Sequence, residues 1–343
     1  MFCTEAMACL SRVVLTLAIL AGTALADIEL ADGRLALDAL GSANAKWQRT
    51  ERLGLSAGRF DFYRLRAPVG LIGVVNRTAL FRVSFDAGLY EGVYDLHINL
   101  GWPNGFGLRA GQFLLPVGLE AMTQPKHVSF VEHSIVRANW RPWSSRDVDI
   151  WDPRDVGVML TFGKEHEGRQ FPVSHVEVAV AVVNGSGKGQ WLRDDNDWKD
   201  VCGRVAVRPM SGVDALIAAR GYYGRMGTEG TIFRNSAAEF SVRLGRLRLV
   251  GEGQHAVAGT NTRITLYLQG VYSARPWLEP VIRTDASFRP NETDLGLTPG
   301  LNVIFGGDRL RLMLNYGYRR RMSSDPGLRL AEQRLLAQLQ AWL

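Results

Sequence analysis

The sequence predicts an all-β protein, a transmembrane antiparallel β-barrel of about 16 strands. Apolar and polar residues alternate over short segments along nearly the whole chain, as in strands with two different faces. These segments recur at roughly 20 residues per strand with its connection, which is the spacing of outer-membrane barrels. A stretch typical of an export signal precedes them.

Residues 1–26 are predicted to be a cleaved secretory signal peptide. The apolar run at 13–20 is too short to cross a membrane as a helix, which needs roughly 20 apolar residues. It follows Arg12, and Ala24 and Ala26 supply the small residues that precede a cleavage site. The mature chain is therefore expected to be an exported protein.

The mature chain, residues 27–343, is predicted to form a single outer-membrane barrel domain. No composition break or linker divides it, and this weighs against two soluble β-sandwiches, the alternative for alternating strands. Cleavage removes Cys3 and Cys9 and leaves Cys202 without a partner for a disulfide. Cys202 lies in an alternating run, so we interpret it as a small strand residue and not as a catalytic thiol.

The segment 309–319 shows which face of such a strand meets lipid. Leu312 and Leu314 share one face, whereas Arg311 and Arg319 share the other. An arginine that faces lipid at the bilayer midplane costs roughly 2–4 kcal/mol. The leucine face is therefore expected to point outward, and the arginine face into a water-filled channel.

The lengths of the connections also favour a barrel. Short links alternate with longer ones, as expected when turns gather at one end and loops at the other. Residues 61–78 are too long for a short turn, and the pattern leaves them without an assigned place. The predicted strands are 33–40, 51–60, 80–88, 94–102, 107–113, 154–162, 175–183, 200–209, 213–223, 239–245, 246–254, 263–272, 278–288, 294–305, 309–319 and 335–343. The longer links are 115–153, 184–199, 224–236 and 321–332.

Parity along these strands assigns a set of mostly basic residues to the channel. Such a set would concentrate anions and exclude cations, because a low-dielectric wall focuses its field. The inward residues are predicted to be Arg52, Arg82, Asp86, His97, Asn99, Arg109, Arg204, Arg208, Arg243, Arg311 and Arg319. Arg321 is expected to lie outside the pore. Aromatic residues near strand ends are interpreted as interface girdles, namely Trp102, Tyr272, Trp277, Tyr316, Tyr318 and Trp342.

The link at 115–153 is the third outward loop by this count, and it is expected to fold into the barrel and narrow it. Long loops without structure of their own are usually functional or disordered. Lys126 and Arg137 flank the segment FVEHS, and Ser129 adds a hydroxyl donor. These three residues are the predicted charged constriction.

Five ordered segments closely resemble the phosphate-selective porin O and P family. They are LRAGQFLLPVGLE (108–120), FVEHS (130–134), RDVGVMLTF (154–162), VAVVNGSG (180–187) and KDVCGRVAVRP (199–209). The resemblance implies a 16-stranded porin, usually trimeric, with an anion path lined by arginine and lysine. Lys126, Ser129 and Arg137 fall roughly where the family has its constriction residues, and Asp86 resembles an acid in its third strand.

The predicted function is passive uptake of phosphate or related small anions through an anion-selective channel. The expected location is the bacterial outer membrane, with outer-membrane lipid, lipopolysaccharide and two further copies of the chain as partners. No cofactor, metal, nucleic acid or enzymatic activity is expected. The alternatives are a general porin of low selectivity, or an outer-membrane enzyme that uses His133 and Ser134, whose adjacent side chains should point apart on an extended chain.

Overall fold

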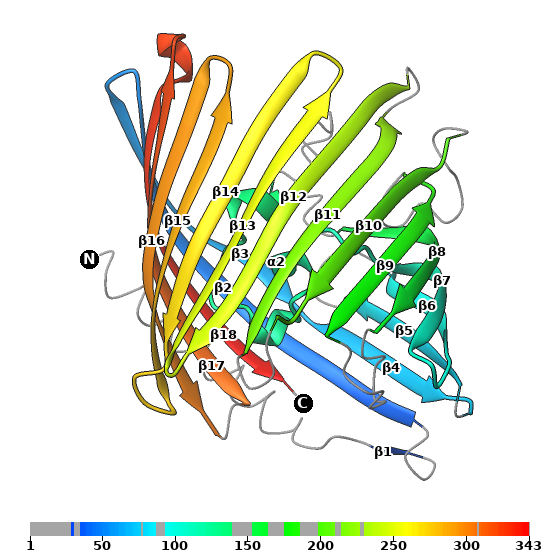
Figure 1. Cartoon of the computed structure of the whole chain (residues 1–343). Helices are drawn as coiled ribbons and strands as arrows, with labels where there is room; N and C mark the ends of the chain where they lie inside the picture. Colours follow the sequence, from blue (N-terminus) through cyan, green and yellow to red (C-terminus); the bar gives the residue numbers. More distant parts are fainter. Residues whose placement is uncertain are drawn as a thin grey trace.

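The described strands form a closed antiparallel barrel, which confirms the predicted fold class (Figure 1). The computed structural model describes residues 29–30, 35–76, 78–86, 93–138, 153–163, 175–185, 198–209, 214–226, 230–306 and 309–342. The predicted signal peptide and residues 139–152 lie outside this part of the chain. Among the residues described, no helix is long and apolar enough to cross a membrane.

The barrel wall has 16 strands, as predicted. The sheet elements are β1 (Glu29–Leu30), β2 (Leu35–Arg52), β3 (Leu55–Arg66), β4 (Pro68–Val74), β5 (Ala79–Asp86), β6 (Val93–Gly101), β7 (Phe106–Leu114), β8 (Arg154–Phe162), β9 (Val176–Val183), β10 (Asp200–Val207), β11 (Ala215–Met226), β12 (Thr231–Leu244), β13 (Leu247–Ala258), β14 (Asn261–Tyr272), β15 (Leu278–Arg289), β16 (Glu292–Phe305), β17 (Leu310–Ser323) and β18 (Leu330–Trp342). β3 and β4 count as one strand because both pair with β2, and β1 is only a two-residue addition to the start of β2.

The barrel closes between its last long strand and its first. β18 pairs antiparallel with β2 from Ala331 opposite Glu51 to Trp342 opposite Leu40. β2 therefore begins at the end of the barrel where β18 finishes, and we call this the terminal end (Figure 1). This pairing joins the two ends of the sheet, and closure of this kind is what a barrel in lipid requires.

The two predicted strands at the start of the chain have wrong boundaries. The segment 51–60 contains a hairpin turn, in which Leu53 and Gly54 have φ angles of 52° and 77°. The segment 61–78, unplaced from the sequence, contains the rest of β3 and all of β4. Ala67 interrupts the strand. Its N–H donates to the side-chain carboxylate of Asp86 at 2.7 Å and not to a backbone carbonyl.

Parts of the predicted long links are strand in the structure: 231–236 belongs to β12, and 321–323 and 330–332 belong to β17 and β18, on either side of η2 (Pro326–Leu328). The strands from β11 to β18 have 12 to 14 residues, whereas β5 to β10 have only 8 or 9, so one side of the wall is much taller (Figure 1). The ends of the taller hairpins are polar in composition, and for this reason they were predicted to be loops. In the structure the strand residues among them still form the hydrogen bonds between neighbouring strands. The link at 115–153 remains long.

The two faces of the strands separate as predicted. On β17, Leu314 and Tyr316 are 40% and 42% exposed, whereas Arg311, Met313 and Asn315 are buried. Apolar groups therefore point outward and polar groups inward. Cys202 is buried in β10, as expected of a small strand residue.

Trp342 departs from the predicted girdle. It shares the inner face of β18 with the buried residues Leu336 and Gln340, and its ring lies 5.6 Å from the Arg311 guanidinium carbon. The predicted outer face of β18, represented by the exposed Leu335, has the opposite parity. The other predicted girdle residues, Trp102, Tyr272, Trp277, Tyr316 and Tyr318, are exposed.

Candidate functional site

The structure distributes the predicted pore residues along the inner face of the wall. Arg82, Asp86, His97, Asn99, Arg109, Arg204, Arg208, Arg311 and Arg319 all have inward parity within their strands or directly after them. Arg52 lies instead at a hairpin tip, where its Nε donates to the Gly327 carbonyl at 2.8 Å. Arg243 lies at the terminal end and pairs with the exposed Asp214 at 3.0 Å. These two side chains are exposed at the rims of the barrel.

Basic side chains do not dominate the inner face, contrary to the prediction. Carboxylates at the same inward parity pair with the arginines, because a buried charge needs a partner. Arg82, for example, contacts the carboxylates of Asp38 at 2.8 Å and of Asp95 at 3.4 Å. Further pairs are Arg66–Asp86 at 3.1 Å, Arg204–Glu239 at 2.9 Å and Arg319–Asp294 at 2.9 Å, together with Arg208–Glu177.

Arg220 on β11 is the centre of a buried network that the sequence analysis missed. Its guanidinium contacts Glu239 at 3.4 Å and Glu252 at 2.8 Å, and it donates to Asn235 at 3.0 Å and to Gln254 at 2.9 Å. All four partners come from the two strands that follow β11, at inward parity. Applying the parity rule to acids and amides as well as to arginines would have identified them.

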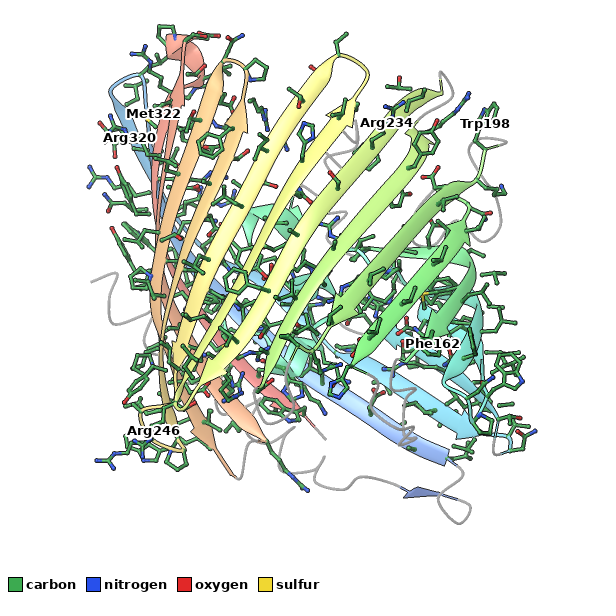
Figure 2. The ribbon with its side chains drawn as sticks, in the orientation of Figure 1. Phe162, Trp198, Arg234, Arg246, Arg320 and Met322 are labelled. Carbon is green, nitrogen blue, oxygen red and sulfur yellow. The ribbon has the colours of Figure 1, made fainter. Side chains whose placement is uncertain are left out.

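Arg321 lies on the inner face, not outside the pore as expected. Its Nε lies 3.2 Å from Asp294 and 3.3 Å from Glu292, both on β16. Arg321 has the same parity as Arg311 and Arg319, whereas the exposed Arg320 has the outward parity. Figure 2 shows Arg320 near the end of the barrel opposite the termini.

Residues 115–138 pack against the inner faces of β13–β18. This segment contains α2 (Leu119–Met122), η1 (Pro125–His127) and α3 (Ile135–Ala138). Three apolar contacts hold it: Phe130 packs on Val271 and Val281, Val131 on Met313 and Leu336, and Val136 on Val250 and Tyr267. The predicted narrowing of the channel by this loop stays a prediction.

Backbone hydrogen bonds also join the loop to inward side chains. The N–H groups of Val131 and Ile135 donate to Asn315 at 2.8 Å and to Asp285 at 2.9 Å. Arg283 on β15 donates to the Glu132 carbonyl at 2.9 Å, and its Nε pairs with Asp285 at 2.8 Å. Side chains of the wall therefore satisfy loop backbone groups that a helix or a sheet would otherwise satisfy.

Glu120 on α2 holds the two ends of this segment together. Its carboxylate accepts the Ser134 N–H at 3.1 and 3.0 Å and the Ser134 hydroxyl, and it lies 3.6 Å from His133 Nδ1. Burial by itself would raise the pKa of Glu120, but the hydrogen bond and charge of His133 and the charges of Arg283 and Arg137 lower it from 4.5 to about 2. Glu120 is therefore ionised whenever the pH is well above 2.

The lowered pKa of Glu120 leads to a prediction about acid. The stabilisation that it supplies is complete above its ordinary pKa of 4.5 and is lost as the pH falls towards 2. We expect the single-channel conductance in a planar bilayer to be constant from pH 7 to 5 and to change between pH 4 and 2. Glu120→Gln, which cannot ionise, should flatten that acid-dependent change. An equally steep change in the variant would show that other carboxylates cause it.

The three predicted constriction residues have different surroundings. Arg137 donates to the Glu120 carbonyl at 3.1 Å and so stabilises the loop itself. Ser129 lines a cleft between the loop and the wall, and its carbonyl accepts from Asn302 at 3.2 Å. Lys126 lies on η1, half-buried, and within the described ranges it makes no hydrogen bond or ion pair.

The cleft beside Ser129 is also lined by an arginine that forms no ion pair with any described residue. Arg248, on the inner face of β13, makes no hydrogen bond or ion pair with any described residue, and the buried Tyr267 hydroxyl also has no partner. The remaining polar lining groups are Thr123, His127, Gln269 and Glu120. Arg248 and Lys126 can therefore attract an anion without first breaking an ion pair.

His133 and Ser134 are not arranged as a catalytic base and nucleophile. Both contact Glu120, so the expectation that their side chains point apart was wrong, because the chain turns into α3 at this point. The Ser134 hydroxyl is completely buried and donates to the carboxylate instead of to an imidazole. Among the residues described, no three His, Cys, Asp or Glu side chains gather as a metal site.

The fold is that of outer-membrane porins, although sequence comparison finds no relative: no family model and no curated protein matches the chain. An anion-selective porin from Comamonas acidovorans is 10% identical, with a TM-score of 0.64 over 90% of this chain and 100% of that one. The channel DcaP of Acinetobacter baumannii is 11% identical, with a TM-score of 0.61 over 93% and 100%. OmpF of Salmonella typhi, solved with daunomycin, is 12% identical, with a TM-score of 0.62 over 92% and 100%.

Proposed function

We propose that the chain forms a water-filled channel in a bacterial outer membrane and that this channel prefers small anions. The observation that carries the proposal is the pair Lys126 and Arg248. Lys126 lies on the loop and Arg248 on the inner wall. Neither forms an ion pair with a carboxylate in the described part of the chain. Most other inward arginines are paired, so these two should contribute most of the local positive potential.

Phosphate is the anion for which we propose uptake, together with related small anions. Support comes from the resemblance of five ordered segments to the phosphate-selective porin O and P family. Arg248, Ser129 and Tyr267 offer the charged and hydroxyl donors that phosphate oxygens accept. Passive transport also needs weak binding, and Glu120 in the same cleft limits how tightly an anion is held.

We also propose that the chain is exported with a cleaved signal peptide and assembles as a homotrimer. OmpT of Vibrio cholerae has a trimer form with a similar fold, 12% identical with a TM-score of 0.59 over 90% of this chain and 99% of that one. The export signal over residues 1–26 would bring the chain to the membrane where it inserts. We propose transport and no enzymatic activity.

Reversal potentials in a planar bilayer test the selectivity. With a tenfold gradient of potassium chloride, we expect anions to permeate about two- to tenfold better than potassium, because only a few inward cations are unpaired. Phosphate added to one side should then reduce the chloride current at millimolar concentrations or below. A potential of the cation-selective sign, or no conductance from correctly folded protein, would contradict the proposed function.

A general porin of low selectivity is the second candidate. It is favoured by the ion pairs of the inner face, such as Arg204–Glu239 and Arg319–Asp294, which cancel much of the wall charge. The same bilayer measurement distinguishes the two candidates. A reversal potential near zero, with no reduction of the chloride current by phosphate, would establish the second.

A further inference from the structure

The outer surface of the barrel carries a cationic patch with no role in the proposed channel. It lies where β17, β18, β2 and β3 pair side by side, towards the end opposite the termini. We define the patch by four outward residues: Arg320 and Tyr318 on β17, Gln333 on β18 and Arg49 on β2. Figure 2 shows Arg320 and Met322 at this side of the barrel.

The strand register places an apolar row directly below the patch. Tyr316 lies opposite Leu335, Leu335 opposite Trp47, and Trp47 opposite Phe60. All four side chains point outward and are between 38% and 53% exposed. A row of large apolar and aromatic groups on the outer surface of a barrel is typical of the boundary between hydrocarbon and headgroups.

The patch begins in the next outward row. There Tyr318 lies opposite Gln333, and Gln333 opposite Arg49. Arg320 lies in the following row, opposite Ala331. Arg49 and Arg320 are therefore two strands apart, about 10 Å across the sheet. Because each side chain extends over several ångströms, both guanidinium groups can reach a single group that lies between them.

Neither guanidinium has an acidic partner among the residues that the structure describes. Arg49 donates through Nε to the Ser56 hydroxyl at 2.9 Å, and Arg320 makes no hydrogen bond or ion pair with any described residue. The exposed Glu51, in the row of Arg320, is the carboxylate nearest in register, and no ion pair joins it to either arginine within the described residues. Both arginines therefore keep guanidinium N–H groups that can donate to an incoming anion.

We infer that this patch binds the phosphate groups of a membrane lipid, of the kind carried by lipopolysaccharide. The height of the patch, one row above the aromatic boundary, is where lipid phosphates lie. Guanidinium forks match phosphate oxygens, and the tyrosine and the amide add neutral donors. The inference rests on the proposed membrane location, but not on the anion selectivity of the channel.

Binding of lipid A to the purified full-length mature barrel in detergent tests this inference. The probes are bisphosphorylated lipid A, lipid A from which both phosphates have been removed, and inorganic phosphate. We expect the unmodified chain to prefer the bisphosphorylated form. Arg49→Gln combined with Arg320→Gln should weaken that binding roughly 10- to 30-fold. The matched control is Arg246→Gln with Arg275→Gln, two exposed arginines in turns at the terminal end, where Figure 2 labels Arg246; it should bind as the unmodified chain does.

Three results would overturn the inference: no change in the double variant, an equal loss in the control, or inorganic phosphate that competes as well as the lipid does. Heat-dependent migration on gels would verify that each variant is folded. The reversal potential of the double variant should equal that of the unmodified channel. If the channel proved unselective while the lipid result stood, only the proposed function would fail.

Discussion

Lys126→Glu combined with Arg248→Glu is expected to reverse the selectivity of the channel. The double variant replaces two unpaired positive charges by two negative ones, a change of four charge units, and Arg248 lines the same cleft as Glu120. At a few ångströms in a partly hydrated pore, such a change should shift the ratio of anion to cation permeability by about tenfold or more. Reversal potentials in a potassium chloride gradient would measure it.

The matched control for this reversal is Arg234→Glu combined with Arg320→Glu. Both arginines are exposed on the outer surface, and both are labelled in Figure 2. The control changes the total charge of the protein by the same amount but leaves the channel unchanged, so its reversal potential should remain that of the parent. Equal shifts in the two double variants would attribute selectivity to net charge and would remove the case for Lys126 and Arg248.

Arg283→Met is expected to release the loop from the wall. Arg283 lies between Asp285 at 2.8 Å and Glu120 at 3.9 Å, donates to the Glu132 carbonyl and lies over the Phe130 ring at 4.6 Å. Methionine keeps the apolar stem but leaves the buried Glu120 and the half-buried Asp285 without this cation, at a cost of about 3–5 kcal/mol. The loop should then move more freely, with larger and noisier single-channel conductance and faster cleavage by trypsin.

Arg319→Met supplies the comparison for Arg283→Met. Arg319 is also an inward arginine that pairs with a carboxylate, Asp294 at 2.9 Å, but that partner belongs to the adjacent strand of the wall. Its removal should destabilise the barrel locally without changing the noise of the channel or the cleavage of the loop. The role of Arg283 in holding the loop would be refuted if both variants gave the same conductance and the same cleavage pattern.

Strand identity and facing could be predicted from short-range alternation, but strand boundaries could not. On β17 the period of two residues was sufficient to assign Leu314 outward and Arg311 inward, because one face must meet lipid. The hairpin at Leu53 and Gly54 was missed because alternation continues on both sides of it. The break at Ala67 depends on Asp86, a partner 19 residues away, and no local pattern indicates it.

Some residues of the candidate site could likewise be predicted from local sequence, and others could not. Lys126 and Ser129 were identified from the loop sequence, whereas Arg248 and Tyr267 lie in strands 119 to 141 residues further along the chain. Arg248 was overlooked because the sequence around it looks like the sequence around the arginines that form ion pairs. Only the folded chain shows that Arg248 forms no ion pair with a described carboxylate, although Glu120 lines the same cleft.

Alternation by itself determined that this chain forms a closed barrel with an apolar outer face and a charged inner face. The reason is that side-chain direction follows a period of two residues, and lipid accepts only one of the two faces. The tertiary structure decided which inward charges cancel and which stay available. The pair Arg204–Glu239 joins β10 to β12, with another strand between them in the chain, and an electrostatic field depends on distances in space.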